Sequence, residues 1–346
     1  MGNDVKTIYD ISKEAGVSIA TVSRVLNGSH KVSAKTKEKV LNVMEKYEYR
    51  PNAFARGLGT GSMRTIGIMC SDVADIYLAS AVSFLERELK KQGFYSVLCC
   101  SGYEYESKVK SLENLENNKV DAVILVGSQY IEKDSTKNNY IKQTSERIPV
   151  MLLNGYLKGK QIYCNLSDDY EAYADATERL IAAGARNILF LYREETFSMI
   201  KKKKGYCAAL EEHCIACDDQ LIFCCNDKVK IVKANLIQKY EELLRDGKRI
   251  DAVIATDDEM AIAALKFAKE KNLRVPEELA IVGCNNSVLA ISTEPELSSI
   301  DNKCELLCVN TVSTLMRVLN KQEASNKTVV MTEFVERKTT NHEFME

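Results

Sequence analysis

The sequence predicts an α/β protein built from a small helix-turn-helix head and a body of two doubly wound parallel sheets. At 346 residues the chain is too long for one ordinary domain. From residue 64 onward, short β-rich runs alternate with amphipathic stretches, which is the pattern of βαβ units. Charge is also divided unevenly, because residues 1–64 hold eleven basic and six acidic residues, whereas the remainder holds 36 basic and 43 acidic residues.

This charge distribution favours a nucleic-acid partner for the head. The formal charge of the whole chain is −2, which by itself argues against such a partner. Counted by segment, it is +5 over residues 1–64 and −7 over the rest. A short basic module on an acidic body is typical of a protein that contacts nucleic acid at one end only.

The composition and the N-terminus indicate a cytoplasmic protein without a membrane partner. Hydrophobic residues make up 45% of the chain and charged residues 28%, as in ordinary folded proteins. No run approaches the ~20 apolar residues that a membrane span needs. The N-terminal MGNDVKTIYD also lacks the apolar core of a signal peptide.

Three helices are expected in the head. Within TIYDISKEAGVSIATVSRVLN (residues 7–27), Gly16 permits a tight turn and Ser18 is placed to cap a second helix. Apolar residues at helical spacing mark the faces that would pack together: Ile8, Ile11 and Ala15, then Val22, Val25 and Leu26, then Val40, Val43, Met44 and Tyr47. Two short helices across a glycine turn, supported by a third, form a helix-turn-helix unit.

The outward face at the start of the second helix is short, polar and basic, which suits a DNA major groove. The residues on this face are Ser18, Ile19, Ala20, Thr21, Ser23 and Arg24.

The body is expected to hold eight or more strands in two lobes that share a cleft. The predicted strands are Thr65–Cys70, Phe94–Cys100, Val120–Val126, Val150–Asn154, Asn187–Tyr192, Leu221–Cys225, Ala252–Ala255 and Leu279–Cys284. Helical patterns between them include Ala79–Gln92, Tyr170–Ala183, Lys230–Arg245 and Met260–Lys271.

The twelve cysteines are expected to be reduced thiols in the fold, because the chain is long and carries no export signal. The alternative is a zinc site formed by His213, Cys214 and Cys217 with Cys207. A second CxxC pair at finger spacing is absent from the sequence, so we expect no metal and no cofactor.

The run TIYDISKEAGVSIATVSRVLNGSHKVS, followed by YRPNAFARGL, closely resembles the DNA-binding head of the LacI/GalR (lactose-repressor) family of bacterial transcriptional regulators. The resemblance is nearly gapless over about 60 residues. It continues more weakly, but in order, through RTIGIM, GARNILFL, KKKKGYCAAL, TDDEMAIAAL and VGCNN. It implies a sequence-specific regulator, most often a repressor, that binds a double-stranded DNA operator.

The resemblance assigns roles to individual residues of the head. Arg24 would contact guanine in the major groove, and Ile19 and Ala20 would read thymine methyl groups and groove shape. Residues suited to phosphate contacts are Thr7, Tyr9, Thr21, Ser23 and Asn27. Residues 51–58 match the family's hinge helix, from which Asn52, Ala55 and Leu58 would contact the minor groove, with Leu58 as the apolar wedge.

For the body, the resemblance implies a periplasmic-binding-protein-like fold that binds an effector between its lobes. Ligands of such sheets bind at the carboxyl ends of the strands, where carboxylate and amide groups suit sugar hydroxyls and a tyrosine ring can stack on a pyranose. The candidates at these ends are Asp72, Tyr77, Leu78, Ser101, Gly127, Asp168, Asp257, Asp258, Asn285 and Asn286. Helix capping is an equal alternative for Asp168 and Asp257.

Two residues depart from the family pattern and leave the effector open. Lys202 stands where sugar-binding and purine-binding members usually carry arginine, and Asn285 replaces the aspartate of the VGxD motif. Lys and Arg are not equivalent at a bidentate site. The run of four lysines at 201–204 therefore suggests either a phosphorylated or acidic effector, or simply a solvated helix face. Catabolite control proteins share the head motif, so a phosphorylated carrier protein is an alternative partner. A second alternative is a regulator whose cleft no longer binds an effector.

A palindromic operator requires a two-fold dimer. The tail at 338–346 lacks the apolar heptads of tetrameric members, so we expect a homodimer. The expected boundaries are a head at 1–50, a hinge at 51–63 and a body at 64–346. Within the body, we expect one lobe at about 64–164 and 292–322 and the other at about 165–291 and 323–346.

An enzyme is not expected. The chain has three histidines and no tryptophan, and no strand is followed by a glycine-rich phosphate loop or a GxSxG nucleophile elbow. Adjacent aspartates at 168–169 and 257–258 more often cap helices than hold a metal.

Overall fold

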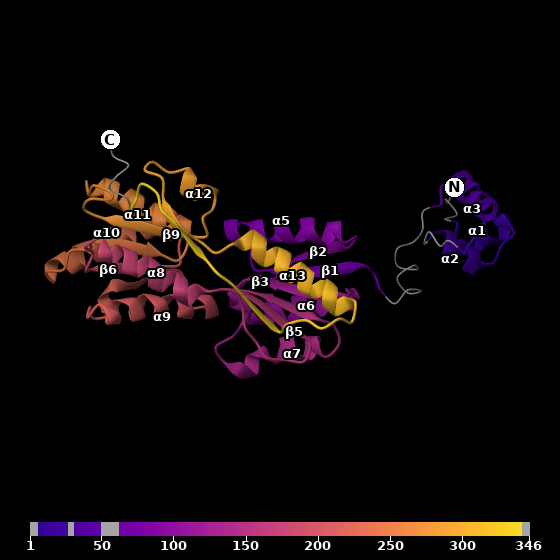
Figure 1. Ribbon diagram of the computed structural model, residues 1–346, viewed down its shortest axis with the longest axis horizontal. Coiled ribbons are helices and arrows are strands. Elements are labelled where there is room, and N and C mark those ends of the chain that lie inside the picture. The colour runs from indigo at the N-terminus through magenta and orange to yellow at the C-terminus, as the bar shows by residue number, and fades with distance from the viewer. Residues whose placement is uncertain (1–5, 27–30, 50–61, 341–346) are drawn as a thin grey trace. The chain divides into compact units, whose positions relative to one another are not determined.

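The computed structural model describes residues 6–26, 31–49 and 62–340 of the chain (Figure 1). The chain forms two compact units, one ending at Thr65 and the other beginning at Ile66. Each unit is described by itself.

The first unit packs three helices, α1 (Ile8–Ala15), α2 (Ile19–Leu26) and α3 (Ala34–Lys46), around a small apolar core. The fully enclosed residues of this core are Ile11, Ala15, Val22, Val25 and Val40. The other apolar residues expected at the helix interfaces, from Ile8 to Tyr47, pack against it. The helical spacing therefore predicted all three packing faces correctly.

Single residues mark where the first two helices end and begin. Gly16 ends α1 with a φ of 58°, in the left-handed region that glycine adopts without strain. Ser18 then caps α2, since its Oγ accepts a hydrogen bond from the Thr21 N–H at 3.2 Å. At the start of α1, the Thr7 N–H and hydroxyl both donate to Asp10 Oδ2 at 2.8 Å.

The second unit contains two six-stranded sheets with helices on both faces. The first sheet has the order β11-β5-β4-β3-β1-β2. Its strands are β1 (Thr65–Cys70), β2 (Tyr95–Cys100), β3 (Ala122–Val126), β4 (Val150–Leu153), β5 (Ile162–Ser167) and β11 (Lys327–Val330). One face packs on α5 (Ile76–Lys91) and α13 (Cys304–Leu319), the other on α6 (Tyr105–Asn117) and α7 (Asn139–Ser145). We call this sheet with its helices the first lobe.

The second sheet has the order β12-β10-β9-β8-β6-β7 and forms the second lobe. Its strands are β6 (Ile188–Tyr192), β7 (Ile222–Cys224), β8 (Ala252–Ala255), β9 (Ala280–Cys284), β10 (Ser298–Asp301) and β12 (Glu333–Val335). One face packs on α10 (Val229–Arg245) and α11 (Asp258–Glu270), the other on α8 (Asp169–Ala182) and α9 (Phe197–Glu212).

Short helical turns complete the body. They are η1 (Ser128–Tyr130), η2 (Ser135–Asn138), η3 (Asp219–Leu221) and α12 (Val288–Ile291).

Eight of the strand pairs in the described part of the chain are parallel, and one pair at the edge of the second sheet is antiparallel. The pairs β1–β3, β3–β4, β4–β5 and β5–β11 are parallel, as are β6–β7, β6–β8, β8–β9 and β9–β10. Strand β12 runs antiparallel to β10, which departs from the expectation of purely parallel sheets. The eight strands expected from the sequence are all present, and β5, β10, β11 and β12 are additional.

The C-terminal region divides between the lobes differently from the expected boundaries. Strand β10 pairs with β9 and so lies in the second sheet, although 292–322 was assigned to the first lobe. Strand β11 pairs with β5 in the first sheet, although the region after 322 was assigned to the second lobe. The chain therefore crosses between lobes after β5, before α13 and after β11, and these three crossings join the lobes.

The cysteine expectation is wrong for two residues. Cys207, near the end of α9, and Cys217, in the loop that follows, have Cα atoms 5.4 Å apart and form a disulfide. The turn after α9 brings them together. Because both thiols are consumed, they are not available to the alternative zinc site. In the described part of the chain, no group of three or more His, Cys, Asp or Glu residues is arranged to hold a metal ion.

Helices α8 and α9 approach closely at Gly205, which explains why a glycine stands at this position. A Cβ at Gly205 would lie 2.0 Å from the Tyr170 carbonyl oxygen and 3.0 Å from the Ala174 nitrogen, both in α8 or at its start. The neighbouring Tyr206 is fully buried and its hydroxyl donates to the Ile188 carbonyl at 2.7 Å.

We predict that Gly205→Ala destabilises the body by about 3 kcal/mol, because backbone atoms of α8 must move to accept the methyl group. The urea midpoint of the full-length protein, followed by circular dichroism, measures this loss. Lys204→Ala, at an exposed position of the same helix, is the control and should change stability by less than about 0.5 kcal/mol. Equal midpoints for the two variants would contradict the close-approach role of Gly205.

Candidate functional site

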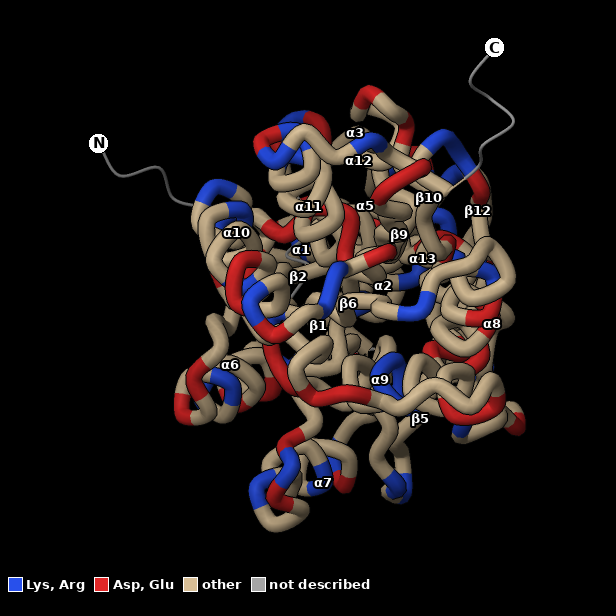
Figure 2. The backbone as a smooth tube through the Cα atoms, turned by 90° about the vertical axis from the view of Figure 1, so that its left-hand side faces the viewer, with Lys and Arg blue, Asp and Glu red and all other residues tan. Residues whose placement is uncertain are grey.

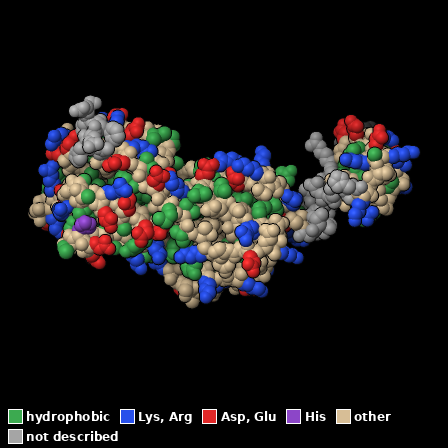
Figure 3. Space-filling model, viewed as in Figure 1, with side chains coloured by type: hydrophobic (Ala, Val, Ile, Leu, Met, Phe, Trp, Pro, Cys, Tyr) green, Lys and Arg blue, Asp and Glu red, His purple; other side chains and the backbone are tan. Residues whose placement is uncertain are grey.

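The head presents the expected face of α2 to solvent. Ile19, Ala20 and Arg24 are exposed, with 39% of the Ile19 surface accessible. Thr21 and Ser23 are half-buried. Lys and Arg side chains are visible at several places on the surface of this unit (Figure 3).

The remaining DNA-binding candidates differ in exposure and in whether their side chains already form hydrogen bonds within the protein. Tyr9 is 69% exposed on α1. Thr7 and Ser18 are exposed but serve as helix caps, and the Ser18 hydroxyl also lies 2.9 Å from that of Thr21. Asn27, Asn52, Ala55 and Leu58 lie outside the described residues.

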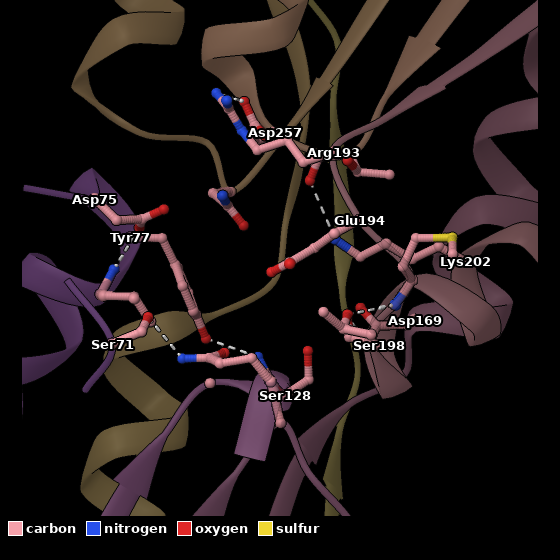
Figure 4. Close-up of a pocket in the computed structure, with 18 of the residues that line it drawn as sticks. Ser71, Asp75, Tyr77, Ser128, Asp169, Arg193, Glu194, Ser198, Lys202 and Asp257 are labelled. Carbon is pink, nitrogen blue, oxygen red and sulfur yellow. Dashed lines mark hydrogen bonds and ion pairs between the residues drawn. The ribbon is translucent and has the colours of Figure 1, made fainter. Parts of the chain in front are cut away.

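In the body, a cleft of about 250 Å³ lies between the two lobes, and it is lined by residues that follow the strands of both sheets (Figure 4). From the first lobe, these are Ser71, Asp75, Tyr77, Leu78, Tyr103, Gly127, Ser128, Gln129 and Asn154, and Asn302 lies at the crossing from β10 of the second lobe into α13. From the second lobe they are Asp169, Arg193, Glu194, Thr196, Ser198, Met199, Lys202, Asn226, Thr256, Asp257 and Asn285.

Six of the residues expected at an effector site line this cleft. They are Tyr77, Leu78, Gly127, Lys202, Asp257 and Asn285. The other candidates do not line it, and their polar groups form hydrogen bonds within one lobe.

The side chains of Asp72, Ser101 and Asp168 form hydrogen bonds with other groups of the first lobe or with a helix start. Asp72 Oδ1 accepts the Ala74 N–H at 2.9 Å, which closes a turn after β1. Ser101 is 3% exposed, and its hydroxyl bonds to the Gly102 carbonyl and to the Tyr130 hydroxyl, both at 2.9 Å. Asp168 caps α8 through the Glu171 N–H at 3.4 Å, so capping was the correct alternative for this residue.

Asp258 and Asn286 hold the second lobe together instead of facing the cleft. Asp258 is 2% exposed and accepts hydrogen bonds from Ser299 Oγ, Ser287 Oγ and the Ser287 N–H at 2.6–2.7 Å. Asn286 Oδ1 accepts from the Arg337 guanidinium at 2.7 Å.

Arg193, directly after β6, organises the second-lobe side of the cleft. Its Nε donates to Asp257 Oδ2 at 2.8 Å, and a second nitrogen reaches Glu259 at 2.5 Å. A third contact runs to the Asp227 carbonyl at 3.0 Å. Asp257 also caps α11 through the Met260 N–H at 2.8 Å, so for this residue capping and a place in the cleft occur together.

Lys202 is the only member of the lysine run at 201–204 that lines the cleft. It is 8% exposed, whereas Lys201 and Lys204 face solvent on α9, where the run forms a blue stretch of the tube (Figure 2). Its ammonium donates to the Thr256 carbonyl at 3.2 Å and lies 3.5 Å from Cys284 Sγ. Burial by itself lowers the pKa of Lys202, but Cys284 and the Asp169 carboxylate outweigh burial, so the pKa is raised and the ammonium keeps its charge.

Asp169 and Asn154 also line the cleft. Asp169 accepts the Ser198 hydroxyl at 2.6 Å, and burial raises the pKa of its carboxyl. Asn154 Nδ2 donates to the Tyr77 hydroxyl at 2.7 Å, while its Oδ1 accepts from Ser167 at 3.0 Å. This pair fixes the tyrosine ring of the first lobe against the strand ends.

Asn285 and Asn302 close the cleft beside the crossing into α13. Asn302 Nδ2 donates to Asn285 Oδ1 at 2.8 Å, so the amide oxygen of Asn285 is already occupied. The Asn302 Oδ1 atom is buried and has no hydrogen-bond partner among the described residues.

The sequence reasoning missed eight of the eleven charged and amide residues that line the cleft, namely Asp75, Gln129, Asn154, Asp169, Arg193, Glu194, Asn226 and Asn302. Asn154 ends a predicted strand run and Arg193 directly follows another, so listing every polar residue at a strand end would have found both. Asp75 comes from the N-cap of α5, and Asn302 follows a strand that the sequence did not predict.

Two family models match this chain. The model of bacterial regulatory proteins of the lacI family matches residues 7–52, and that of a periplasmic binding protein-like domain matches residues 177–340. An HTH-type transcriptional regulator from Lachnoclostridium phytofermentans is 47% identical over 334 residues, which are 96% of this chain and 99% of the relative. The chain belongs to the lacI family. It is a DNA-binding transcriptional regulator, in a family of regulators rather than enzymes.

Other lacI-family relatives extend over nearly the whole chain. Catabolite control protein A of Priestia megaterium is 30% identical over 332 residues, which are 95% of this chain and 97% of the relative. The solved structure of the lac repressor dimer bound to operator and the anti-inducer ONPF has a TM-score of 0.84 at 24% identity, covering 97% of this chain and 99% of its own. A complex of the transcriptional regulator CelR with cellobiose has a TM-score of 0.70 at 24% identity, covering 96% of this chain and 99% of the CelR chain.

These likenesses establish the fold as a helix-turn-helix head with a two-lobed periplasmic-binding-protein-like body. Among the helices of the described residues, none is long and apolar enough to cross a membrane.

We predict that Arg193→Lys destabilises the body by about 1 kcal/mol, since a lysine ammonium cannot contact Asp257, Glu259 and the Asp227 carbonyl at once. Chemical unfolding of the full-length protein measures the change. Arg245→Lys, at an exposed position of α10, is the matched control and should remain within about 0.5 kcal/mol of wild type. A loss of the same size in both variants would argue against the bridging role of Arg193.

Proposed function

We propose that this regulator is a repressor that binds a pseudo-palindromic operator as a homodimer and is gated by a small polar effector in the interlobe cleft. The observation that carries the proposal is the cleft itself, in which polar groups from both lobes converge. A ligand that contacts both lobes can favour one arrangement of the lobes over another, which is what gating requires.

The relatives support the dimer, the operator DNA and the sugar effector, which the shape of the cleft does not by itself indicate. The lac repressor structure is that of a dimer on operator DNA, and CelR is bound to cellobiose. A two-fold dimer matches a palindromic site because each head occupies one half-site. Since its target is chromosomal DNA, we place the protein in the cytoplasm.

The DNA-reading residues of the proposal are those on the exposed face of α2. Arg24 would donate to a guanine, and Ile19 and Ala20 would contact thymine methyl groups. Thr21, Ser23, Tyr9 and Thr7 would contact phosphates. Of the residues outside the described ranges, we retain Asn27 for a phosphate contact and Asn52, Ala55 and Leu58 for the minor groove.

Arg24→Ala is expected to cost about 1–3 kcal/mol on the best operator and to relax specificity at one base pair of each half-site. Selection from a random DNA library, followed by fluorescence anisotropy on the selected site and its single-base variants, measures both effects. Lys13→Ala removes an exposed head charge from α1 and should weaken binding to all sequences evenly. If Arg24→Ala discriminates among the base variants as wild type does, Arg24 does not read a base.

Effector gating is tested by titrating the operator complex with sugars, sugar phosphates, purines and a phosphorylated carrier protein. We expect a small molecule to shift operator affinity by roughly 5-fold to 150-fold, the usual range of coupling between sites. The 30% identity to catabolite control protein A makes the carrier protein the alternative. A response to that protein alone, or to no ligand, would overturn gating by the cleft while leaving operator binding intact.

A further inference from the structure

The disulfide between Cys207 and Cys217 is unexpected in a regulator of chromosomal DNA. The two Cα atoms are 5.4 Å apart, and the bond joins the second half of α9 to the loop before η3, across a sequence separation of ten residues. Small thiols keep most cysteines of the cytoplasm reduced, and the disulfides that do form there are usually transient, catalytic or redox-sensing. In that compartment a disulfide is therefore more often a switch than a permanent crosslink.

The bonded pair lies near the surface, where a dissolved thiol can reach it. Cys207 and Cys217 are both half-buried. Between them, the turn at 211–214 and Ala216 are exposed. Thiol–disulfide exchange depends on access to a sulfur, so this place allows exchange without prior unfolding of the lobe. Most of the free thiols are less accessible, since the structure buries those of Cys70, Cys164, Cys225, Cys284 and Cys308.

Few other contacts hold the loop at Cys217. The main-chain hydrogen bonds that end α9 stop at Ile215, whose N–H donates to the Leu210 carbonyl at 2.8 Å. Within the described residues, the main chain of Ala216 and of Cys217 forms no hydrogen bond. The disulfide is thus the principal attachment of this loop to α9, supplemented by the packing of the Ile215 and Cys217 side chains on the second-lobe core.

Helix α9 does not depend on the bond for its own position. Tyr206, next to Cys207, is fully buried, and its hydroxyl donates to the Ile188 carbonyl at 2.7 Å. Gly205 packs directly on the backbone of α8. Because these contacts remain when the two sulfurs separate, the second lobe keeps its fold in both redox states, as a reversible modification requires.

We propose that Cys207 and Cys217 form a reversible thiol–disulfide modification site, which fixes the loop after α9 when oxidised and releases it when reduced. The reaction partners are a small thiol of the glutathione class and its disulfide. Neither cysteine lines the interlobe cleft, so the site is separate from that of an effector. Its role in the cell depends on the cytoplasmic location proposed above, whereas its chemistry does not.

Reduction of the pair proceeds by two exchange steps. A glutathione thiolate attacks one sulfur of the pair and forms a mixed disulfide with it, and the other cysteine leaves as a thiolate that takes up a proton. A second glutathione thiolate attacks the glutathione sulfur of the mixed disulfide and releases the second cysteine, which is protonated in turn. Two glutathione molecules are thereby oxidised to one glutathione disulfide, and their two electrons and two protons pass to the cysteines. The reverse steps restore the bond.

The first test is a redox titration of the full-length protein in mixtures of reduced and oxidised glutathione. Free thiols are then alkylated, and the peptides that contain Cys207 and Cys217 are quantified by mass spectrometry. We expect both peptides to pass together from alkylated to protected as the proportion of oxidised glutathione rises. A pair that stays oxidised in reduced glutathione alone, or that stays reduced in oxidised glutathione alone, would overturn the proposal.

Hydrogen exchange measures what the bond does to the loop. The N–H groups of residues 213–215 donate to main-chain carbonyls of α9. Reduction should speed their exchange by roughly tenfold or more, because the loop loses the link that limits its freedom. The amides of residues 201–204 are an internal control, since the contacts of Gly205 and Tyr206 hold that part of α9 in either state.

Variants assign the effect to the pair. Cys207→Ser and Cys217→Ser should each show the fast exchange of the reduced protein in every glutathione mixture. Cys214→Ser is the matched control, because it removes an exposed free thiol from the same turn and leaves the pair intact. It should titrate and exchange as wild type does.

Unchanged exchange at residues 213–215 after reduction and in both variants of the pair would show that the bond does not hold the loop. Loss of the glutathione transition in Cys214→Ser would show that Cys207 and Cys217 do not form the site by themselves. Either result would overturn the proposal. None of these measurements involves operator DNA or an effector, so their outcomes are distinct from a failure of the proposed function.

Discussion

The parallel pairing of the strands is the constraint on which the rest of the body depends. Parallel strands end at the same edge of a sheet, so the residues that follow them gather there without being close in sequence. In this chain the edges of both sheets face one cleft, which brings together residues as distant as Ser71 and Asn302. Most of the cleft's polar side chains lie within three residues of a strand end or a helix start.

The same constraint explains why so many cleft residues have two roles. A residue that follows a parallel strand often precedes a helix, where the free N–H groups need a capping acceptor. Asp75 and Asp257 therefore each cap a helix with one oxygen while lining the cleft. Asp168 caps a helix but does not line the cleft, whereas its neighbour Asp169 lines it. Capping and ligand contact are alternatives only where the second oxygen points away from the ligand.

Much of the fold could be predicted because it depends on local patterns. The eight predicted strands are apolar runs bounded by polar residues, and the head's helices follow from i, i+3, i+4 spacing around Gly16 and Ser18. The missed strands β5, β10, β11 and β12 are short or rich in polar residues, as in the SSID of β10. They are strands because neighbouring strands offer them hydrogen bonds, which a local pattern does not reveal. The expected lobe boundaries were wrong near the C-terminus for this reason.

By itself, the sequence determined the three-helix head, the α/β class of the body, the regulatory family and the division of charge between a basic head and an acidic remainder. These depend on composition, periodicity and motifs, which are properties of neighbouring residues. Only the tertiary structure decided which polar residues share the cleft and that Lys202 is separated from the other lysines of its run. Hydrogen-bond and charge balance in the cleft depend on distances between segments remote in sequence, and folding alone fixes those distances.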